Sequence, residues 1–251
     1  MPSNVEYAAD LALGAGRLLR TLQRSAGVAQ LGTEALRKRG DRASQEYLMG
    51  RLESERSSDS VLSEEAPDSS SRLSAHRVWI IDPLDGTREF AEGRDDWAVH
   101  VALWEDGELV AGAVALPGID EILTSADVPR IVSRPPRIRL AVSRSRPPAL
   151  VGYLAEVLDA ELVPLGSAGY KTAAVVRGEA DAYVHAGGQY EWDSAAPVAV
   201  ARQANLFTSR IDGSRPVYNQ PDVYLPDLVV CDPTISELVL GTLSAYRGEI
   251  E

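Results

Sequence analysis

Two aspartates, Asp82 and Asp85, stand three residues apart in the stretch WIIDPLDGTREF, which covers residues 79 to 90. The stretch opens as a nearly continuous apolar segment, typical of a buried strand, and continues into Gly86 and Thr87. Carboxylates paired in this way can bind a hard divalent cation, or one of them can act as a covalent nucleophile. The spacing of the two aspartates should distinguish these two chemistries.

Pro83 favours a turn directly after Asp82, because its ring fixes φ and removes a backbone donor. Two aspartates three residues apart can then direct their carboxylates to one point across the turn. The covalent motif instead has aspartates two residues apart, which an extended strand places on one face. The spacing therefore favours cation binding, with water rather than Asp82 as the nucleophile.

Further acidic residues stand where helices or strands are expected to begin or end. Asp41 occupies the expected N-cap of a helix, and Asp193 the expected start of another. Glu64 and Glu65 lie in a polar loop. Two like charges about 4 Å apart repel by roughly 4 kcal/mol at an effective dielectric constant of ~20, so gathered carboxylates would need cations between them. Taken singly, each residue also has a structural interpretation, as a helix cap or a solvated loop residue.

Composition and charge exclude several classes of protein. The 251 residues are 45% apolar and 25% charged, as in a globular protein, and the net charge is −12. This charge argues against nucleic-acid or anionic-membrane partners, and an anionic substrate would need a cation to reach an acidic site. Cys231 is the only cysteine, so an intrachain disulfide is excluded. The three histidines, His76, His100 and His185, lack the spacing of a zinc site.

We expect a cytoplasmic location. The sequence begins MPSNVEYAAD, without the basic start and apolar run of a secretory leader. No stretch approaches the ~18 consecutive apolar residues of a membrane span. The expected partner is therefore a small molecule rather than nucleic acid or a membrane.

Periodicity divides the chain into two halves of different kinds. In residues 1–130 we expect two helices, a polar loop over 53–77 with one brief strand, and then an antiparallel sheet that includes a hairpin around Glu105-Asp106-Gly107. In residues 131–251 strands alternate with helices, the pattern of an α/β half. The strands of this half are expected at 137–143, 160–165, 181–186 and 227–232, with helices at 147–158, 169–178, 192–204 and 234–247.

The motif WIIDPLDGT, together with LSEE before it and WDSAAP after it, resembles the inositol monophosphatase family of lithium-sensitive, Mg²⁺-dependent phosphomonoesterases. The three motifs occur in the family's order and span residues 62 to 197. The resemblance implies an α/β fold in α-β-α-β-α layers, shared with fructose-1,6-bisphosphatase. It also implies two or three Mg²⁺ ions, and it leaves a homodimer open.

Within the family, the chain looks most like the CysQ-type bisphosphate nucleotidases, in particular actinobacterial ones. LSEEAP, the ending Arg88-Glu89-Phe90 and the stretch VSRSRPP carry this likeness. Inositol-specific members end the first motif in Thr-Asn-Phe and place a glutamate seven residues before the second-motif aspartate, where this chain has Ala186. The implied substrate is adenosine 3′,5′-bisphosphate, or also 3′-phosphoadenylyl sulfate. The alternative is a broad phosphatase for inositol 1-phosphate or fructose 1,6-bisphosphate.

The resemblance also assigns roles to residues. Glu64 and Thr87 would orient or deprotonate the attacking water, and Asp41 would assist, although Lys38-Arg39-Gly40-Asp41 departs from the family's Thr-x-x-Asp. The implied metal ligands are Glu64, Asp82, the Leu84 carbonyl, Asp85 and Asp193. The implied substrate-binding residues are Leu84, Asp85, Gly86, Thr87, Ser143, Arg144, Gly166, Ser167, Lys171 and Asp193.

Several alternatives stay open. Lys171 could equally be a solvated helix lysine, and Tyr218 and Tyr224 are more often packing residues than platforms for a base. The chain could also be a catalytically silent Mg²⁺- or nucleotide-binding regulator, although such a binder does not need both Thr87 and Glu64. An acidic structural protein without metal is the third possibility.

Overall fold

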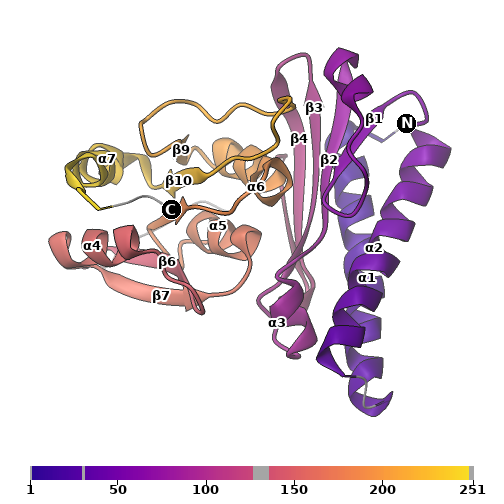
Figure 1. The fold of residues 1–251 in the computed structure, drawn as a ribbon, viewed down its shortest axis with the longest axis horizontal. Coiled ribbons are helices and arrows are strands. Elements are labelled where there is room, and N and C mark those ends of the chain that lie inside the picture. The colour runs from indigo at the N-terminus through magenta and orange to yellow at the C-terminus, as the bar shows by residue number, and fades with distance from the viewer. Residues whose placement is uncertain (1, 30–31, 127–135, 249–251) are drawn as a thin grey trace.

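Two five-stranded sheets with helices on both faces build the protein as five layers (Figure 1). The computed structural model describes residues 2–29, 32–126 and 136–248. From right to left in Figure 1, the layers are two long helices, the first sheet, a central helix pair, the second sheet, and a last helix pair. The predicted α-β-α-β-α order is confirmed.

The first sheet carries the DPLDG motif and has the strand order β1-β2-β3-β4-β5. β1 runs parallel to β2, and the remaining neighbours are antiparallel, including the predicted β3–β4 hairpin. The register between β2 and β3 shifts between Asp82 and Asp85, so the motif forms an irregularity within β2. The strands are β1 (Ser60–Ser63), β2 (Arg77–Asp85), β3 (Ala98–Glu105), β4 (Glu108–Leu116) and β5 (Glu121–Thr124).

Helices α1 (Asn4–Ala29) and α2 (Thr33–Glu55) cover the outer face of this sheet. The buried residues of α2 recur every four positions along the helix, from Leu36 to Leu52. The prediction that Asp41 caps a helix is wrong, because α2 begins at Thr33 and Asp41 lies in its interior. Gly40 is not a helix break. A Cβ there would lie 2.7 Å from Phe90 Cε1, so the glycine permits close packing.

The central layer consists of α5 (Ala168–Val176) and α6 (Glu191–Gln203), which lie between the two sheets. One continuous apolar cluster joins both helices to the inner faces of both sheets. The two helices therefore carry their first turns, with Ser167 and Asp193, to the region of β2. This placement brings the two halves of the chain to one site.

The second sheet has the strand order β7-β6-β8-β10-β9. β7, β6 and β8 run parallel, whereas β10 and β9 are antiparallel to their neighbours. Helices α4 (Ala149–Val157) and α7 (Ser236–Ala245) cover its outer face. The strands are β6 (Arg139–Ser143), β7 (Glu161–Leu165), β8 (Ala182–Ala186), β9 (Phe207–Ser209) and β10 (Asp227–Cys231).

Short elements were not predicted, since a single turn or three residues leave no periodicity to detect. They are β9 and the 3₁₀ turns η1 (Ser70–Ser74), η2 (Pro117–Ile119) and η3 (Pro233–Ile235). The short helix α3 (Thr87–Ala91) begins at Gly86 and Thr87, where the family resemblance implies a helix start. The expected domain boundary at 130/131 lies outside the described residues, so the division at that point stays a prediction. No helix in the described part of the chain is long and apolar enough to cross a membrane.

Packing between β4 and α6 generates a stability prediction. A Cβ on Gly112 would lie 2.5 Å from Ala199 Cβ and 3.0 Å from the Ala196 carbonyl oxygen. Gly112→Ala should therefore push α6 away from the sheet and destabilise the protein by about 1–3 kcal/mol. Gly50→Ala is the matched control, because nothing lies within 4 Å of its Cβ position and alanine favours the helix. Chemical denaturation measures both, and equal stabilities of the two variants would contradict this packing argument.

Candidate active site

Asp82 lies in the irregular segment of β2 and is 1% exposed. Its Oδ1 accepts a hydrogen bond of 3.0 Å from the Leu84 amide. Its Oδ2 has no hydrogen-bond partner among the described residues. Buried polar atoms are normally satisfied, so an unpartnered carboxylate oxygen indicates a place for a ligand. The pKa of Asp82 is raised well above its usual range by burial and then by the negative charges of Glu64 and Asp85.

Asp85 connects β2 to the start of α5. Its carboxylate accepts hydrogen bonds from the Ser167 hydroxyl, the Gly169 amide at 2.6 Å and the Ala168 amide at 3.1 Å. Burial alone would raise the pKa of Asp85, but these donors and His100 outweigh it and lower the pKa. Asp85 is therefore a fixed anion at the junction of the two halves.

His100 is the residue of this site that the sequence interpretation missed. It lies on β3 opposite Asp82 and is fully buried. Its Nε2 lies 3.3 Å from Asp85 Oδ2, and its Nδ1 lies 3.1 Å from the Trp192 carbonyl oxygen. Potential ligand atoms of Asp82, Asp85 and His100 all lie within 4.8 Å of one another. The sequence feature that could have indicated His100 is a single histidine within the apolar strand WAVHVALW. It was not recognised because only zinc-like spacing of the histidines was considered.

Asp193 and Glu64 approach the same cluster from two other elements. Asp193 lies in the first turn of α6, where its Oδ2 accepts a hydrogen bond of 2.7 Å from the Tyr190 amide. Glu64 directly follows β1 and lies at the exposed rim. The pKa of each of these two carboxyl groups is raised to about 7, chiefly by partial removal from water and also by the charge of Asp85. The negative charges of the four predicted acidic ligands therefore interact with one another.

Thr87 and Asp41 lie beside this cluster. The Thr87 hydroxyl donates a hydrogen bond of 3.0 Å to the Leu84 carbonyl oxygen. The pKa of Asp41 is raised to about 6 by burial and by the charge of Glu65, while the Thr87 hydroxyl opposes this rise. Although Asp41 is not a helix cap, α2 still places it at the site.

These residues fit a hard divalent cation. The donors are carboxylate oxygens and a backbone carbonyl, which Mg²⁺ and similar ions prefer. The unpartnered Asp82 Oδ2 and the raised pKa values of its neighbours are both features that a bound cation would remedy. The described residues thus supply oxygen ligands of the kind that a hard divalent cation prefers.

Lys171 lies in the first turn of α5 and is only 6% exposed. Its Nζ donates hydrogen bonds to the Ser167 carbonyl at 2.5 Å and the Gly166 carbonyl at 3.4 Å. Burial lowers its pKa, against the opposing charge of Asp85. The alternative of a solvated helix lysine is therefore excluded.

Arg144 and Ser143 lie at the end of β6, on the flank of the site. The Arg144 guanidinium donates to Asp96 at 2.5 Å and to the Pro164 carbonyl at 3.3 Å. Asp96 also accepts a hydrogen bond of 2.6 Å from the Gly166 amide. A pocket of about 460 Å³ opens here, lined by Gly93, Arg94, Asp95, Asp96, Arg144, Leu165 and Tyr170. Arg144 is therefore held at the wall of a pocket by an internal ion pair.

Tyr218 and Tyr224, the two tyrosines considered as platforms for a base, have different environments. Tyr218 is buried and its hydroxyl lies 3.2 Å from Ser194 Oγ, so it is a packing residue. Tyr224 is 41% exposed and meets Tyr190 edge to face, with ring centroids 5.6 Å apart. Tyr190 also stacks on Trp192 at 5.0 Å. An exposed aromatic edge thus lies three residues from Asp193.

The sequence profile of the inositol monophosphatase family matches residues 2–246. The chain is 48% identical to a 3′-phosphoadenosine 5′-phosphate phosphatase of Mycobacterium leprae, over 96% of this chain and 93% of that protein. It is 30% identical to an inositol-1-monophosphatase of Mesorhizobium japonicum, over 84% of this chain and 88% of that protein.

A solved structure supports the same fold. The structure of CysQ from Bacteroides thetaiotaomicron, described as a bacterial member of the inositol monophosphatase family, superimposes with a TM-score of 0.81. It is 24% identical and covers 91% of this chain and 97% of that one. At this identity, the comparison concerns the fold alone.

The raised pKa values predict how stability depends on pH without metal. Carboxyl groups with folded pKa values near 6 to 7 bind more protons in the folded state than in the unfolded state, so stability falls as pH rises from about 4.5 to about 7. The raised pKa of His100 acts in the same direction. In chelator, Tm should be lower at about pH 8 than at about pH 5.5.

Thermal scans with and without Mg²⁺ provide the check, and the gain in Tm from the ion should be larger at the higher pH. Asp193→Asn removes one of the raised groups and should make the dependence of Tm on pH shallower. A Tm that rises with pH in chelator would contradict the assignment.

Proposed function

Because the chain belongs to the inositol monophosphatase family, we propose that it is a metal-dependent phosphomonoesterase that removes the 3′-phosphate of adenosine 3′,5′-bisphosphate. The observation that carries this proposal is the convergence of four carboxylates from β1, β2 and α6 around the unpartnered Asp82 Oδ2. The name of the 48% identical relative supports the nucleotide substrate. The product would be adenosine 5′-phosphate, and 3′-phosphoadenylyl sulfate would be a second substrate.

We propose Mg²⁺ as the metal, in two or three sites. Glu64, Asp82, Asp85, Asp193 and the Leu84 carbonyl would hold it. When bound, the ions supply water activation, polarisation of the phosphate and stabilisation of the leaving oxygen. Asp85 is already oriented for such a role, because Ser167 and the amides of Ala168 and Gly169 hold its carboxylate in one position.

The chain's own residues would position the water and the phosphate. Thr87 donates its hydroxyl proton to the Leu84 carbonyl, so its oxygen remains available to accept a hydrogen bond from water. Glu64 offers a carboxylate that can accept a proton from this water, and Asp41, which interacts with the Thr87 hydroxyl, can assist. The Gly86 and Thr87 amides begin α3 and would receive phosphate oxygens.

A covalent phospho-aspartate is disfavoured by the burial of Asp82. A nucleophile must reach the phosphorus atom in line with the leaving group, but Asp82 is 1% exposed and one of its oxygens bonds the Leu84 amide. The site supports attack by water. A silent regulator or a metal-free structural protein is also disfavoured, since Thr87 and Glu64 both lie at the cluster.

The aromatic edge of Tyr190 and Tyr224 supports a nucleotide over an inositol phosphate. A purine can stack on an exposed aromatic ring, whereas a polyol gains little from it. The antiparallel bridge between these two residues keeps their rings adjacent. Inositol-specific members carry a glutamate where this chain has Ala186 at the end of β8, so no carboxylate is present there to accept inositol hydroxyls.

Comparing substrates on one preparation tests the proposed function. With Mg²⁺, kcat/KM should be much higher for adenosine 3′,5′-bisphosphate than for inositol 1-phosphate or fructose 1,6-bisphosphate. Asp82→Asn and Asp193→Asn should each lower kcat by about 100-fold or more, because each removes a metal ligand. Asp106→Asn, at an exposed turn, is the control. Preference for a sugar phosphate, or a phospho-aspartyl enzyme trapped by rapid quench, would refute the proposal.

Removing the aromatic edge tests the role of the base. The Tyr190→Leu, Tyr224→Leu double variant should lower kcat/KM for adenosine 3′,5′-bisphosphate by about tenfold, since stacking of one base contributes about 1–3 kcal/mol. Activity on β-glycerophosphate, which has no base, should change little. The phenylalanine variants should retain nucleotide activity, and Tyr153→Leu on α4 is the distant control. Equal losses on both substrates would mean that the tyrosines only support the local structure.

A further inference from the structure

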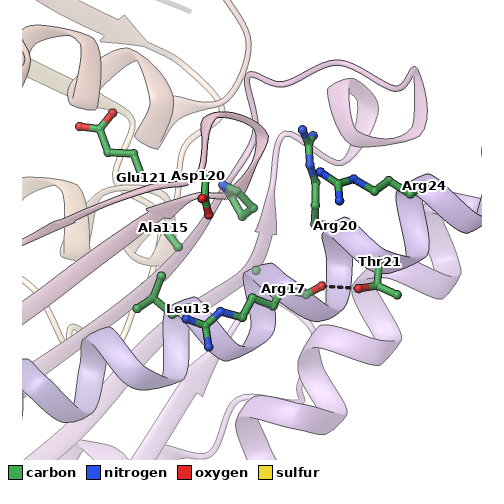
Figure 2. A pocket seen from close by; sticks show the side chains of 10 residues that line it. Leu13, Arg17, Arg20, Thr21, Arg24, Ala115, Asp120 and Glu121 are labelled. Atoms are coloured by element: carbon green, nitrogen blue, oxygen red, sulfur yellow. Dashed lines mark hydrogen bonds between the residues drawn. The ribbon is translucent and has the colours of Figure 1, made fainter.

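A second pocket, of about 330 Å³, lies on the opposite side of the first sheet from the central helices, between α1 and the β4–β5 corner (Figure 2). One wall is the α1 ridge with Arg17, Arg20 and Arg24, and the other wall carries Asp120 and Glu121 (Figure 2). None of the residues implied in catalysis or substrate binding lines this pocket. It is a separate feature of the surface.

The arginine wall is unusual for this protein. The chain has a net charge of −12, yet three arginines line one small pocket at helical spacing. Arg17 and Arg24 are exposed, and neither guanidinium has a hydrogen-bond or ion-pair partner within the described ranges. In Figure 2, Arg17 extends along α1 toward Leu13, whereas Arg20 and Arg24 lie further along the same helix. Arg20 is paired with Asp95, so among the described residues Arg17 and Arg24 are the two guanidinium groups of this wall that are free to offer paired N–H donors to a phosphate.

The other residues that line the pocket indicate which chemical groups a ligand would carry in addition to a phosphate. Pro117 and Ala115 form an apolar floor against α1, and a Cβ on Gly16 would lie 2.7 Å from Pro117 Cγ. The opposite wall offers the carboxylates of Asp120 and Glu121, although Glu121 also lies 3.5 Å from Arg177. A bare anion would meet unfavourable charge there, whereas a hydroxyl or amino group would find an acceptor.

We propose that this pocket binds a phosphorylated small molecule that also carries an amino or hydroxyl group. The phosphate lies against Arg17, Arg20 and Arg24, and the polar group faces Asp120 and Glu121. This inference does not depend on the reaction proposed above, since it concerns different residues and needs no metal.

Arg20 couples the pocket to the loop beside the active site. Its guanidinium donates to Asp95 Oδ1 at 2.8 Å and to the Gly118 carbonyl at 3.0 Å. Gln23, one turn on, donates to the carbonyls of Phe90 and Arg94 at 2.9 and 3.0 Å. A phosphate at Arg20 would compete with Asp95 for the guanidinium and so loosen one attachment of this loop.

The same loop reaches the substrate side of the site. Asp96, next to Asp95, accepts hydrogen bonds from the Gly166 amide and from Arg144. Gly166 precedes Ser167, whose hydroxyl bonds Asp85. Arg20, Asp95, Asp96 and Gly166 therefore form a continuous series of contacts from the pocket to the active site, the kind of physical connection through which two sites can be coupled.

Titration of the metal-free full chain tests the proposal. Without metal, the carboxylates of the active site repel anions and so weaken phosphate binding there. Phosphoethanolamine and inorganic phosphate are titrated in chelator and followed by ³¹P NMR. The wild type should bind phosphoethanolamine, and Arg17→Ala, Arg24→Ala should weaken that binding by about tenfold or more, since the variant lacks both unpaired guanidinium groups of the pocket. Asp95→Ala should strengthen binding, because it releases Arg20.

Matched controls separate specific binding from a general charge effect. Arg42→Ala, Arg215→Ala removes the same charge from exposed arginines outside the pocket and should leave binding unchanged. Asp193→Asn should also bind like the wild type. Equal binding by the wild type and the Arg17, Arg24 variant would overturn the proposal. Inorganic phosphate that binds as tightly as phosphoethanolamine would assign the site to the free anion instead of an ester.

Discussion

The candidate site gathers carboxylates that repel one another, two of them fully inside the protein. Asp82 and Asp85 are buried, Asp193 is half-buried and Glu64 lies at the exposed rim, and three of these four have raised pKa values. Such a cluster is tolerated only if the surrounding fold is rigid and a cation can neutralise it. The five layers provide that rigidity, because three apolar clusters hold the helices against both sheets.

Asp85 is the carboxylate of this cluster that its neighbours stabilise as an anion. It is the one member of the four whose pKa is lowered, since His100, the Ser167 hydroxyl and the charge of Lys171 outweigh the effect of burial. Two backbone amides of α5 also donate to its carboxylate. His100 adds a contact from β3 and reaches the Trp192 carbonyl next to Asp193. The first sheet and the two central helices are thereby joined through the site itself, so metal binding and the packing of the two halves are physically linked.

Much of the fold and of the site could be predicted from the sequence. The strand periodicity of 78–116 and the alternation after 136 predicted both sheets, and three motifs predicted the family and the layered architecture. The step between Asp82 and Asp85 indicated a site at the end of β2, where the register does shift. Short elements such as β9 and the 3₁₀ turns were missed, because three to five residues are too few to show a periodic pattern. Asp41 was misassigned because Gly40 resembled a helix break.

The acidic residues, the order of most helices and strands and the family can all be recognised from local patterns in the chain. Which of these groups meet depends on the packing of distant segments. It placed His100 opposite Asp82, buried Lys171 beneath the Ser167 carbonyl, and exposed Tyr190 and Tyr224 together beside Asp193. These outcomes depend on strand register and on the approach of α5 and α6 to the first sheet. Contacts between residues far apart in the chain leave no local pattern, so a single sequence cannot specify them.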